Sequence, residues 1–250
     1  MKFRTTAKQI AAGIIAAAML VGTLAGCSGN STKQSSASSK AETSTASVKR
    51  GESHDPSIVK ANGKYYIFYH RHSNRKQSSR QACAEEIRFE NGKFLQAEMT
   101  SCGLNNSPLN GTGHYPSYIA CNVYGKKGTR FLSMLKHPKA GHPYLTQKGG
   151  DRESGEDQYV AHMCDGAVAG YKYFDLSETK EICINICGNA SGTVYVRTAE
   201  NGKPVAEIPV KASRARKAFS AKITGLEKKE ALFFSYEGKG SFDFHSFDLK

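Results

Sequence analysis

The feature that most limits the possible folds is a succession of short apolar runs between residues 157 and 250, without any helical period. The runs are rich in β-branched and aromatic residues, and turn signals such as Asn201-Gly202 separate them. In one run, Ile182, Ile184 and Ile186 fall on one face of an expected strand, opposite two cysteines and an asparagine. Regular short strands of this kind predict a β-sandwich. The eight expected strands are Gln158–His162, Ala167–Phe174, Glu181–Cys187, Thr193–Thr198, Pro204–Val210, Ala218–Ile223, Ala231–Tyr236 and Ser241–Phe247.

A second group of strands is expected to begin in the stretch Ser53–Glu86. Asn62-Gly63 and Asn91-Gly92 each lie between two strand-like runs, and Asn-Gly is the strongest short-range signal for a tight hairpin turn. The four expected strands are 57–60, 65–70, 86–89 and 94–99. Two successive hairpins predict one four-stranded sheet. The imidazole of His54 and the carboxylate of Asp55 precede its first strand, where a loop would present them at one end of the sheet.

These stretches resemble glycoside hydrolase family 43, the five-bladed propellers that include β-xylosidases, α-arabinofuranosidases and arabinanases. His54-Asp55-Pro56-Ser57-Ile58 is similar to the first-blade motif, in which the aspartate is the general base, so Asp55 is the candidate base. Because no stretch resembles the blade that supplies the acid, we expect Asp55 to act as a structural residue whose carboxylate accepts backbone N–H bonds in a turn. Tyr66–His72 and Ser79–Glu85 are instead similar to the last blade of the family. Met99–Leu104 and Tyr115–Asn122 resemble the segment that follows the last blade in a branch with an appended β-sandwich.

The expected sandwich resembles a family 6 carbohydrate-binding module, which is a jelly roll. Its ending, Leu232–Tyr236 followed by Ser241–Phe244, fits that resemblance. The resemblance therefore implies only the terminal part of a family 43 enzyme, without the blades that precede the last one. The predicted fold class is all-β, a C-terminal jelly roll preceded by about one propeller blade.

The N-terminal residues have the pattern of a bacterial lipoprotein signal. A charged start and the apolar run Ile10–Val21 lead to Leu24-Ala25-Gly26-Cys27, which resembles the lipoprotein cleavage box with Cys27 as the acylated residue. An ordinary signal peptide or an uncleaved anchor are the alternatives. The expected organisation is a signal peptide (1–27), a Ser/Thr-rich disordered tether (28–48), a blade fragment (49–100), an irregular connecting segment (101–150) and a β-sandwich (151–250). The mature protein would face outward from the bacterial cell membrane.

The candidate ligand sites come from aromatic and acidic residues. Flat aromatic faces suit sugars and tryptophan is absent, so the candidate carbohydrate-binding residues are tyrosines, some of them expected in the core: Tyr115, Tyr118, Tyr171 and Tyr173. In the resembling modules a structural calcium lies near the corner that opens the sandwich. Glu153, Glu156 and Asp157 supply the hard oxygen ligands that calcium prefers. A solvated acidic loop is the alternative, and no other cofactor is expected.

The cysteines and the charge give weaker indications. Of seven cysteines, six remain if Cys27 is lipidated, and an even number permits disulfides in an exported protein. Cys102 with Cys121 is the expected pair, and six reduced thiols are the alternative.

The net charge of +13 comes without a nucleic-acid motif, so no nucleic-acid partner is expected. Attraction to acidic polymers and a merely solvated basic surface both stay open.

Catalysis would require a second carboxylate. Inverting glycosidases, the type that this family resembles, place an acid and a base about 6.5–9.5 Å apart. No stretch resembles the blade of the acid, and Glu85 and Glu86 are expected to be solvent-exposed edge charges. We therefore expect a surface protein that binds plant hemicellulose, xylan or arabinan, without catalysis of its own. The alternatives are an active xylosidase or arabinofuranosidase completed by another glycosidase chain, and an envelope scaffold.

Overall fold

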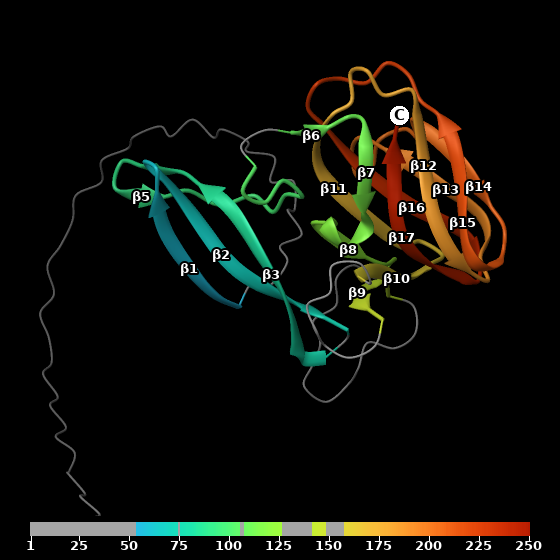
Figure 1. Ribbon diagram of the computed structural model, residues 1–250, viewed down its shortest axis with the longest axis horizontal. Helices are drawn as coiled ribbons and strands as arrows, with labels where there is room; N and C mark the ends of the chain where they lie inside the picture. Colours follow the sequence, from blue (N-terminus) through green and yellow to red (C-terminus); the bar gives the residue numbers. More distant parts are fainter. Residues whose placement is uncertain (1–53, 75, 106–107, 127–141, 149–157) are drawn as a thin grey trace, which may run out of the picture. The chain divides into compact units, whose positions relative to one another are not determined.

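The computed structural model describes residues 54–74, 76–105, 108–126, 142–148 and 158–250 (Figure 1). All of them belong to one folded unit, Ser47–Lys250. The described part consists of β-strands and one short 3-10 helix, η1 (Ser117–Ile119), which confirms the predicted all-β class. No helix in these described ranges is long and apolar enough to cross a membrane.

The first sheet, here called the hairpin sheet, contains β1 (His54–Ala61), β2 (Lys64–Ser73) and β3 (Lys76–Ile87) in that order, all antiparallel. The predicted turn joins β1 to β2. Asn62 and Gly63 both have positive φ, 50° and 79°, as a two-residue turn of type I′ requires. Glycine adopts this conformation without strain, and asparagine tolerates it.

The prediction of a four-stranded sheet is wrong. Residues 86 and 87, which were expected to begin the second hairpin, belong to β3. The second hairpin consists only of the two-residue strands β4 (Phe89–Glu90) and β5 (Lys93–Phe94). The chain then leaves the ladder, because the backbone N–H of Thr100 donates to the carboxylate of Glu85 over 2.7 Å. Residues 95–99 therefore form no strand.

Strand β1 also begins earlier than the sequence suggested. His54 and Asp55 were expected in a loop, but both lie within β1, where His54 pairs with His70 across the sheet. A register shift separates this pair from the next one, Ser57 with Phe68. The side chains of His54 and Asp55 lie outside the described part of the structure, so the role of Asp55 stays a prediction.

The C-terminal part is a sandwich of two sheets (Figure 1). All eight strands expected from the sequence are present. Sheet I contains, in order, β15 (Ser213–Lys222), β12 (Glu181–Gly188), β17 (Ser241–Leu249), β10 (Gln158–Cys164) and β9 (Tyr144–Gln147), with β7 (Gly113–Pro116) also on β17. Sheet II contains, in order, β14 (Ala206–Val210), β13 (Ser191–Arg197), β16 (Glu230–Lys239), β11 (Val168–Asp175) and β6 (Leu109–Asn110), with β8 (Asn122–Tyr124) also on β11.

The segment 101–150 was expected to be an irregular connection, and its described part is not. Strands β6 and β8 pair with β11, β7 pairs with β17, and β9 pairs with β10. The segment joins the sandwich because its short runs complete the hydrogen bonding of strands far along the chain. The hydroxyl of Ser117 in η1 ties it further, since it donates to the carbonyl of Phe244.

The core lies between the two sheets and is dominated by aromatic rings. Phe247 of β17 is fully buried and its ring centroid lies 4.8 Å from Tyr171 and 5.2 Å from Phe234. Ile182 and Ile184 of β12 are buried in the same cluster, as the alternation in the sequence predicted. Because side chains alternate along a strand, the residues next to these buried ones point away from the core.

Candidate functional site

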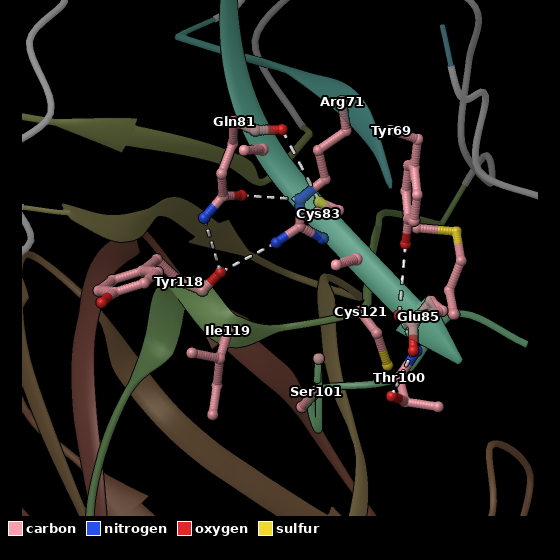
Figure 2. A pocket seen from close by; sticks show the side chains of 14 residues that line it. Tyr69, Arg71, Gln81, Cys83, Glu85, Thr100, Ser101, Tyr118, Ile119 and Cys121 are labelled. Carbon is pink, nitrogen blue, oxygen red and sulfur yellow. Dashed lines mark hydrogen bonds between the residues drawn. The ribbon is translucent and has the colours of Figure 1, made fainter. Parts of the chain in front are cut away.

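A pocket of about 180 Å³ lies where the hairpin sheet meets the sandwich (Figure 2). Strands β2 and β3 contribute Tyr69, Arg71 and Glu85, because alternate residues of these strands share the face that meets the sandwich. The connection after β5 contributes Thr100, and η1 contributes Tyr118. The pocket therefore brings together segments that are distant in the sequence.

Arg71 links the hairpin sheet to the sandwich. Its guanidinium donates to the side-chain oxygen of Gln81 over 2.7 Å and to the carbonyl of Tyr118 over 2.9 Å. A third bond runs to the carbonyl of Ala120. Figure 2 shows the bonds of Arg71 to the side chain of Gln81 and to the carbonyl of Tyr118. Because its donors are engaged in this way, the arginine acts as a structural clamp rather than as a free cation for a ligand.

Glu85 is buried, so the expectation that it is a solvent-exposed edge charge is wrong. One carboxylate oxygen accepts the backbone N–H of Thr100 and the other accepts the hydroxyl of Thr100, each over 2.7 Å. The hydroxyl of Tyr69 adds a weaker bond of 3.4 Å. Burial raises the pKa of Glu85 despite these bonds. Glu86, the next residue, is exposed and pairs with Lys64, as an edge charge would.

These contacts decide what the pocket can do. Its two charged groups, Arg71 and Glu85, both bond to the protein itself, and Glu85 is the one carboxylate among the residues that line it. An inverting or retaining glycosidase needs two carboxyl groups on either side of the scissile bond. The pocket therefore marks the contact between the hairpin sheet and the sandwich, and its described lining does not supply two carboxyl groups for catalysis.

A second set of polar side chains crosses the outer face of sheet I. Val160, Phe244 and Ile186 point into the core of the sandwich, so Tyr159, His245 and Cys187 point outward from three adjacent strands. The rings of Tyr159 and His245 lie 4.6 Å apart at 37°. The Sγ atom of Cys187 lies 3.3 Å from Nε2 of His245.

Two charged residues, Asp243 and Arg216, lie close to these three side chains. Asp243 lies two residues before His245 on β17 and accepts the backbone N–H of His162 over 3.1 Å. Arg216 lies on β15, the neighbour of β12, and its charge acts on Cys187. We call Tyr159, His245 and Asp243, with Cys187 beside them, the aromatic row. It offers the rings of Tyr159 and His245 and the carboxylate of Asp243, which is the combination of apolar surface and few polar groups found in ligand sites.

The electrostatics exclude a cysteine nucleophile in the aromatic row. Burial, together with the nearby charge of Arg216, lowers the pKa of His245 to about 4. Burial raises the pKa of the Cys187 thiol. Both groups are therefore neutral near pH 7, whereas a nucleophilic pair needs a thiolate and an imidazolium. The row can bind through ring faces and neutral hydrogen bonds.

The four predicted carbohydrate-binding tyrosines do not form one surface. Tyr171 is fully buried and donates to the carbonyl of Ser117, so its assignment to a binding surface is wrong. Tyr115 packs against Phe174 and Phe247. Tyr118 borders the pocket, while Tyr173 lies beside Lys229 and donates to Glu98. Sugar binding by Tyr115, Tyr118 and Tyr173 stays a prediction.

The predicted disulfide is absent. Cys102 and Cys121 are both free thiols, as are the other four described cysteines. The Sγ atom of Cys121 lies 3.4 Å from the carbonyl of Gly170, and that of Cys102 lies 3.6 Å from the carbonyl of Lys172. The two thiols thus contact β11 at different residues. The structure therefore agrees with the alternative expectation, that the six cysteines are reduced thiols.

The calcium prediction cannot be placed on the structure. Glu153, Glu156 and Asp157 lie outside the described residues. Within the described ranges no three His, Cys, Asp or Glu residues are grouped closely enough to hold a metal ion. Calcium binding by the acidic loop stays a prediction.

Sequence reasoning missed the aromatic row. Its members are scattered over residues 159, 187, 243 and 245, and only the order of strands in sheet I brings them together. The available signal was the outward position of Cys187 opposite the isoleucines of β12, which the alternation did predict. Nothing in the sequence indicated which outward residues of β10 and β17 would lie beside it.

Comparison with known proteins gives the wider relationship. No family model matches the chain. A xylosidase/arabinosidase of Thermoclostridium stercorarium is 42% identical over 203 residues, which is 80% of this chain and 42% of that protein. The chain is homologous to part of a xylosidase/arabinosidase. It spans less than half the length of this relative.

Two solved structures are similar in fold. The chain matches a glycoside hydrolase family 43 arabinoxylan arabinofuranohydrolase from Bacillus subtilis with a TM-score of 0.52 and 14% identity, over 80% of this chain and 41% of that one. A family 6 carbohydrate-binding module from Clostridium stercorarium, in complex with cellobiose, gives a TM-score of 0.45 and 12% identity over 58% of this chain and 98% of that one. The homology to the xylosidase/arabinosidase confirms the resemblance predicted from the sequence, and the family 43 structure has a similar fold.

Proposed function

We propose that the protein binds hemicellulose, xylan or arabinan, on the outer face of sheet I, and that it does not hydrolyse the polymer on its own. The observation that carries this proposal is the aromatic row, with its two outward rings and its carboxylate. Sugars present apolar C–H faces between polar hydroxyls, so a ring face next to hydrogen-bonding groups is a suitable platform. The homology to a xylosidase/arabinosidase supports the choice of polymer.

The proposal of binding without catalysis rests on the carboxylates. Glu85 is committed to Thr100, and Asp243 accepts a backbone N–H at the margin of the aromatic row. No second carboxylate lines the pocket of Glu85, and the nearby Glu98 is bonded to Lys172 and Tyr173. Glycoside hydrolysis uses a pair of carboxyl groups on either side of the scissile bond. A carbohydrate-binding role needs no such pair.

A second candidate function is that of a glycosidase completed by another chain. The hairpin sheet supports it, because β1 is an edge strand and apolar side chains of β1 and β2 are open to solvent: Ile58 is 43% exposed, Val59 48% and Phe68 40%. Val59 and Phe68 share one face of the sheet. A sheet with such a face gains stability when another sheet covers it.

We also infer that the protein is held on the outer surface of the cell membrane through a lipidated Cys27. The support is the lipoprotein-like sequence around Cys27 and the Ser/Thr-rich stretch that follows it. Two acyl chains hold a protein firmly, whereas a single chain gives marginal binding. Such an anchor would place the aromatic row near polysaccharide outside the cell.

The experiment that tests the binding proposal replaces one ring of the aromatic row. Tyr159→Ala is expected to weaken the affinity for neutral arabinoxylan about tenfold, since loss of one stacked ring costs roughly 1–2 kcal/mol. Isothermal titration with purified residues 47–250 measures the effect. Tyr195→Ala is the matched control, because Tyr195 also points outward but lies on sheet II. Equal affinities of the two variants would contradict the proposal.

A further inference from the structure

The edge of sheet I carries a concentration of positive charge. Strand β15 (Figure 1) is the last strand on its side of the sheet. Most of its residues are exposed. Between Glu207 and Glu227 the chain contains no acidic residue. The basic residues of this stretch, here called the basic edge, are Lys211, Arg214, Arg216, Lys217 and Lys222.

No ion pair neutralises the basic edge within the described part of the chain, although Lys222 lies opposite Glu181 in the ladder between β15 and β12. All five side chains are exposed, and none forms an ion pair with a residue in the described ranges. Elsewhere Lys64, Lys126 and Lys172 pair with carboxylates. Edge strands often carry charge to prevent pairing with other chains. That role does not require so long a stretch without an acid.

The basic edge is continuous with the aromatic row. In the ladder between β15 and β12 a bulge follows the pair of Lys217 with Ile186, and Arg216 in this bulge lies close enough to Cys187 for its charge to act on the thiol. The charge of Arg216 reaches His245 and Tyr159, because it shifts the pKa of both. A polymer lying across the aromatic row toward β15 would therefore meet a line of cations.

We propose that the basic edge binds the carboxylate groups of an acidic polysaccharide, such as a xylan that carries uronic acid substituents. This inference rests on the proposed function and names the class of polymer. Arginine matches a carboxylate with two parallel hydrogen bonds, and lysine adds charge without fixed geometry. From Arg214 to Lys222 the strand extends about 26 Å, which lets one chain of several sugars contact more than one cation.

The test compares an acidic with a neutral polymer. The variant Arg214→Gln/Lys217→Gln/Lys222→Gln removes three charges and leaves Arg216 and the aromatic row intact. Its affinity for glucuronoxylan should fall about tenfold, because exposed charge contacts contribute modestly and add together. Its affinity for neutral arabinoxylan should not change. In the wild type, affinity for glucuronoxylan should fall between 50 mM and 500 mM salt, where screening becomes strong.

The control has the same net charge. Lys203→Gln/Lys228→Gln/Lys239→Gln removes three exposed lysines that lie outside β15, and it should keep the wild-type affinity for glucuronoxylan. Equal losses in the two triple variants would overturn the proposal, since net charge alone would then explain binding. Preferential binding to vesicles of anionic phospholipid, lost in the first variant only, would overturn it in favour of a membrane surface.

The two proposals fail in different ways. If Tyr159→Ala leaves binding of neutral arabinoxylan unchanged, the proposed function is contradicted, while the loss of glucuronoxylan binding in the basic-edge variant is measured independently. If the basic-edge variant binds glucuronoxylan as the wild type does, the assignment of an acidic polymer is overturned and binding at the aromatic row is unaffected.

Discussion

Replacing Phe247 with alanine is expected to lower the free energy of unfolding of residues 47–250 by about 3–5 kcal/mol. The ring is fully buried between the two sheets and contacts rings from several strands. Its centroid lies 4.8 Å from Tyr171, 5.2 Å from Phe234 and 5.8 Å from Phe174. Loss of the ring removes these contacts and leaves a cavity that the rigid strands cannot close. Urea denaturation measures the change.

The control for this prediction is Phe68→Ala. Phe68 lies on the hairpin sheet and is 40% exposed, so its loss should cost less than about 1 kcal/mol. If Phe247→Ala and Phe68→Ala destabilised the protein equally, the aromatic centre of the sandwich would not be the main source of its stability.

Replacing Cys27 with serine is expected to move the protein from the membrane fraction to the soluble fraction or to leave the signal uncut. A thiol at this position is what lipidation requires, and serine offers none. Two acyl chains, at about 0.8 kcal/mol for each buried methylene, make the difference nearly complete. Cell fractionation followed by mass spectrometry of the N-terminus measures both outcomes. Cys83→Ser, which changes a free thiol within the folded unit, should remain with the membranes.

The wild-type protein provides the opposite check. Full-length protein found without lipid in the culture medium would contradict the anchoring proposal. It would leave the polysaccharide-binding site untouched, because that site lies in the folded unit and does not involve Cys27.

The parts of the fold that depend on local signals were predictable from the sequence. Strand β12 was expected from the alternation of Ile182, Ile184 and Ile186, and the turn after β1 from Asn62-Gly63. Both signals act over a few residues, through side-chain period and backbone conformation. The eight strands of the sandwich were found for the same reason.

The short strands of the segment 101–150 could not be found in this way. Strand β7 is four residues long and pairs with β17, which lies about half the chain away. A run of that length has no reliable periodicity, and its partner is set by the tertiary structure. The burial of Glu85 had the same origin, because Thr100 accounts for two of its bonds and lies beyond the hairpin.

The site was less predictable than the fold. Tyrosines were chosen by residue type, which cannot separate a core position such as Tyr171 from a surface position such as Tyr159. Both lie on strands of the sandwich, and the difference is only which face of the strand they occupy. The register between neighbouring strands decides that face, and a single sequence fixes it weakly where bulges occur, as between Val160 and Met163.

The most direct measurement records binding and hydrolysis in one experiment, by titrating purified residues 47–250 with arabinoxylan oligosaccharides and assaying the mixture for newly released reducing ends. The expected result is that the protein binds the arabinoxylan oligosaccharides and releases no new reducing ends. Absence of binding would contradict the account. Release of sugar by the wild type that disappears in Asp55→Asn would also contradict it, because it would make the chain a glycosidase whose base is Asp55.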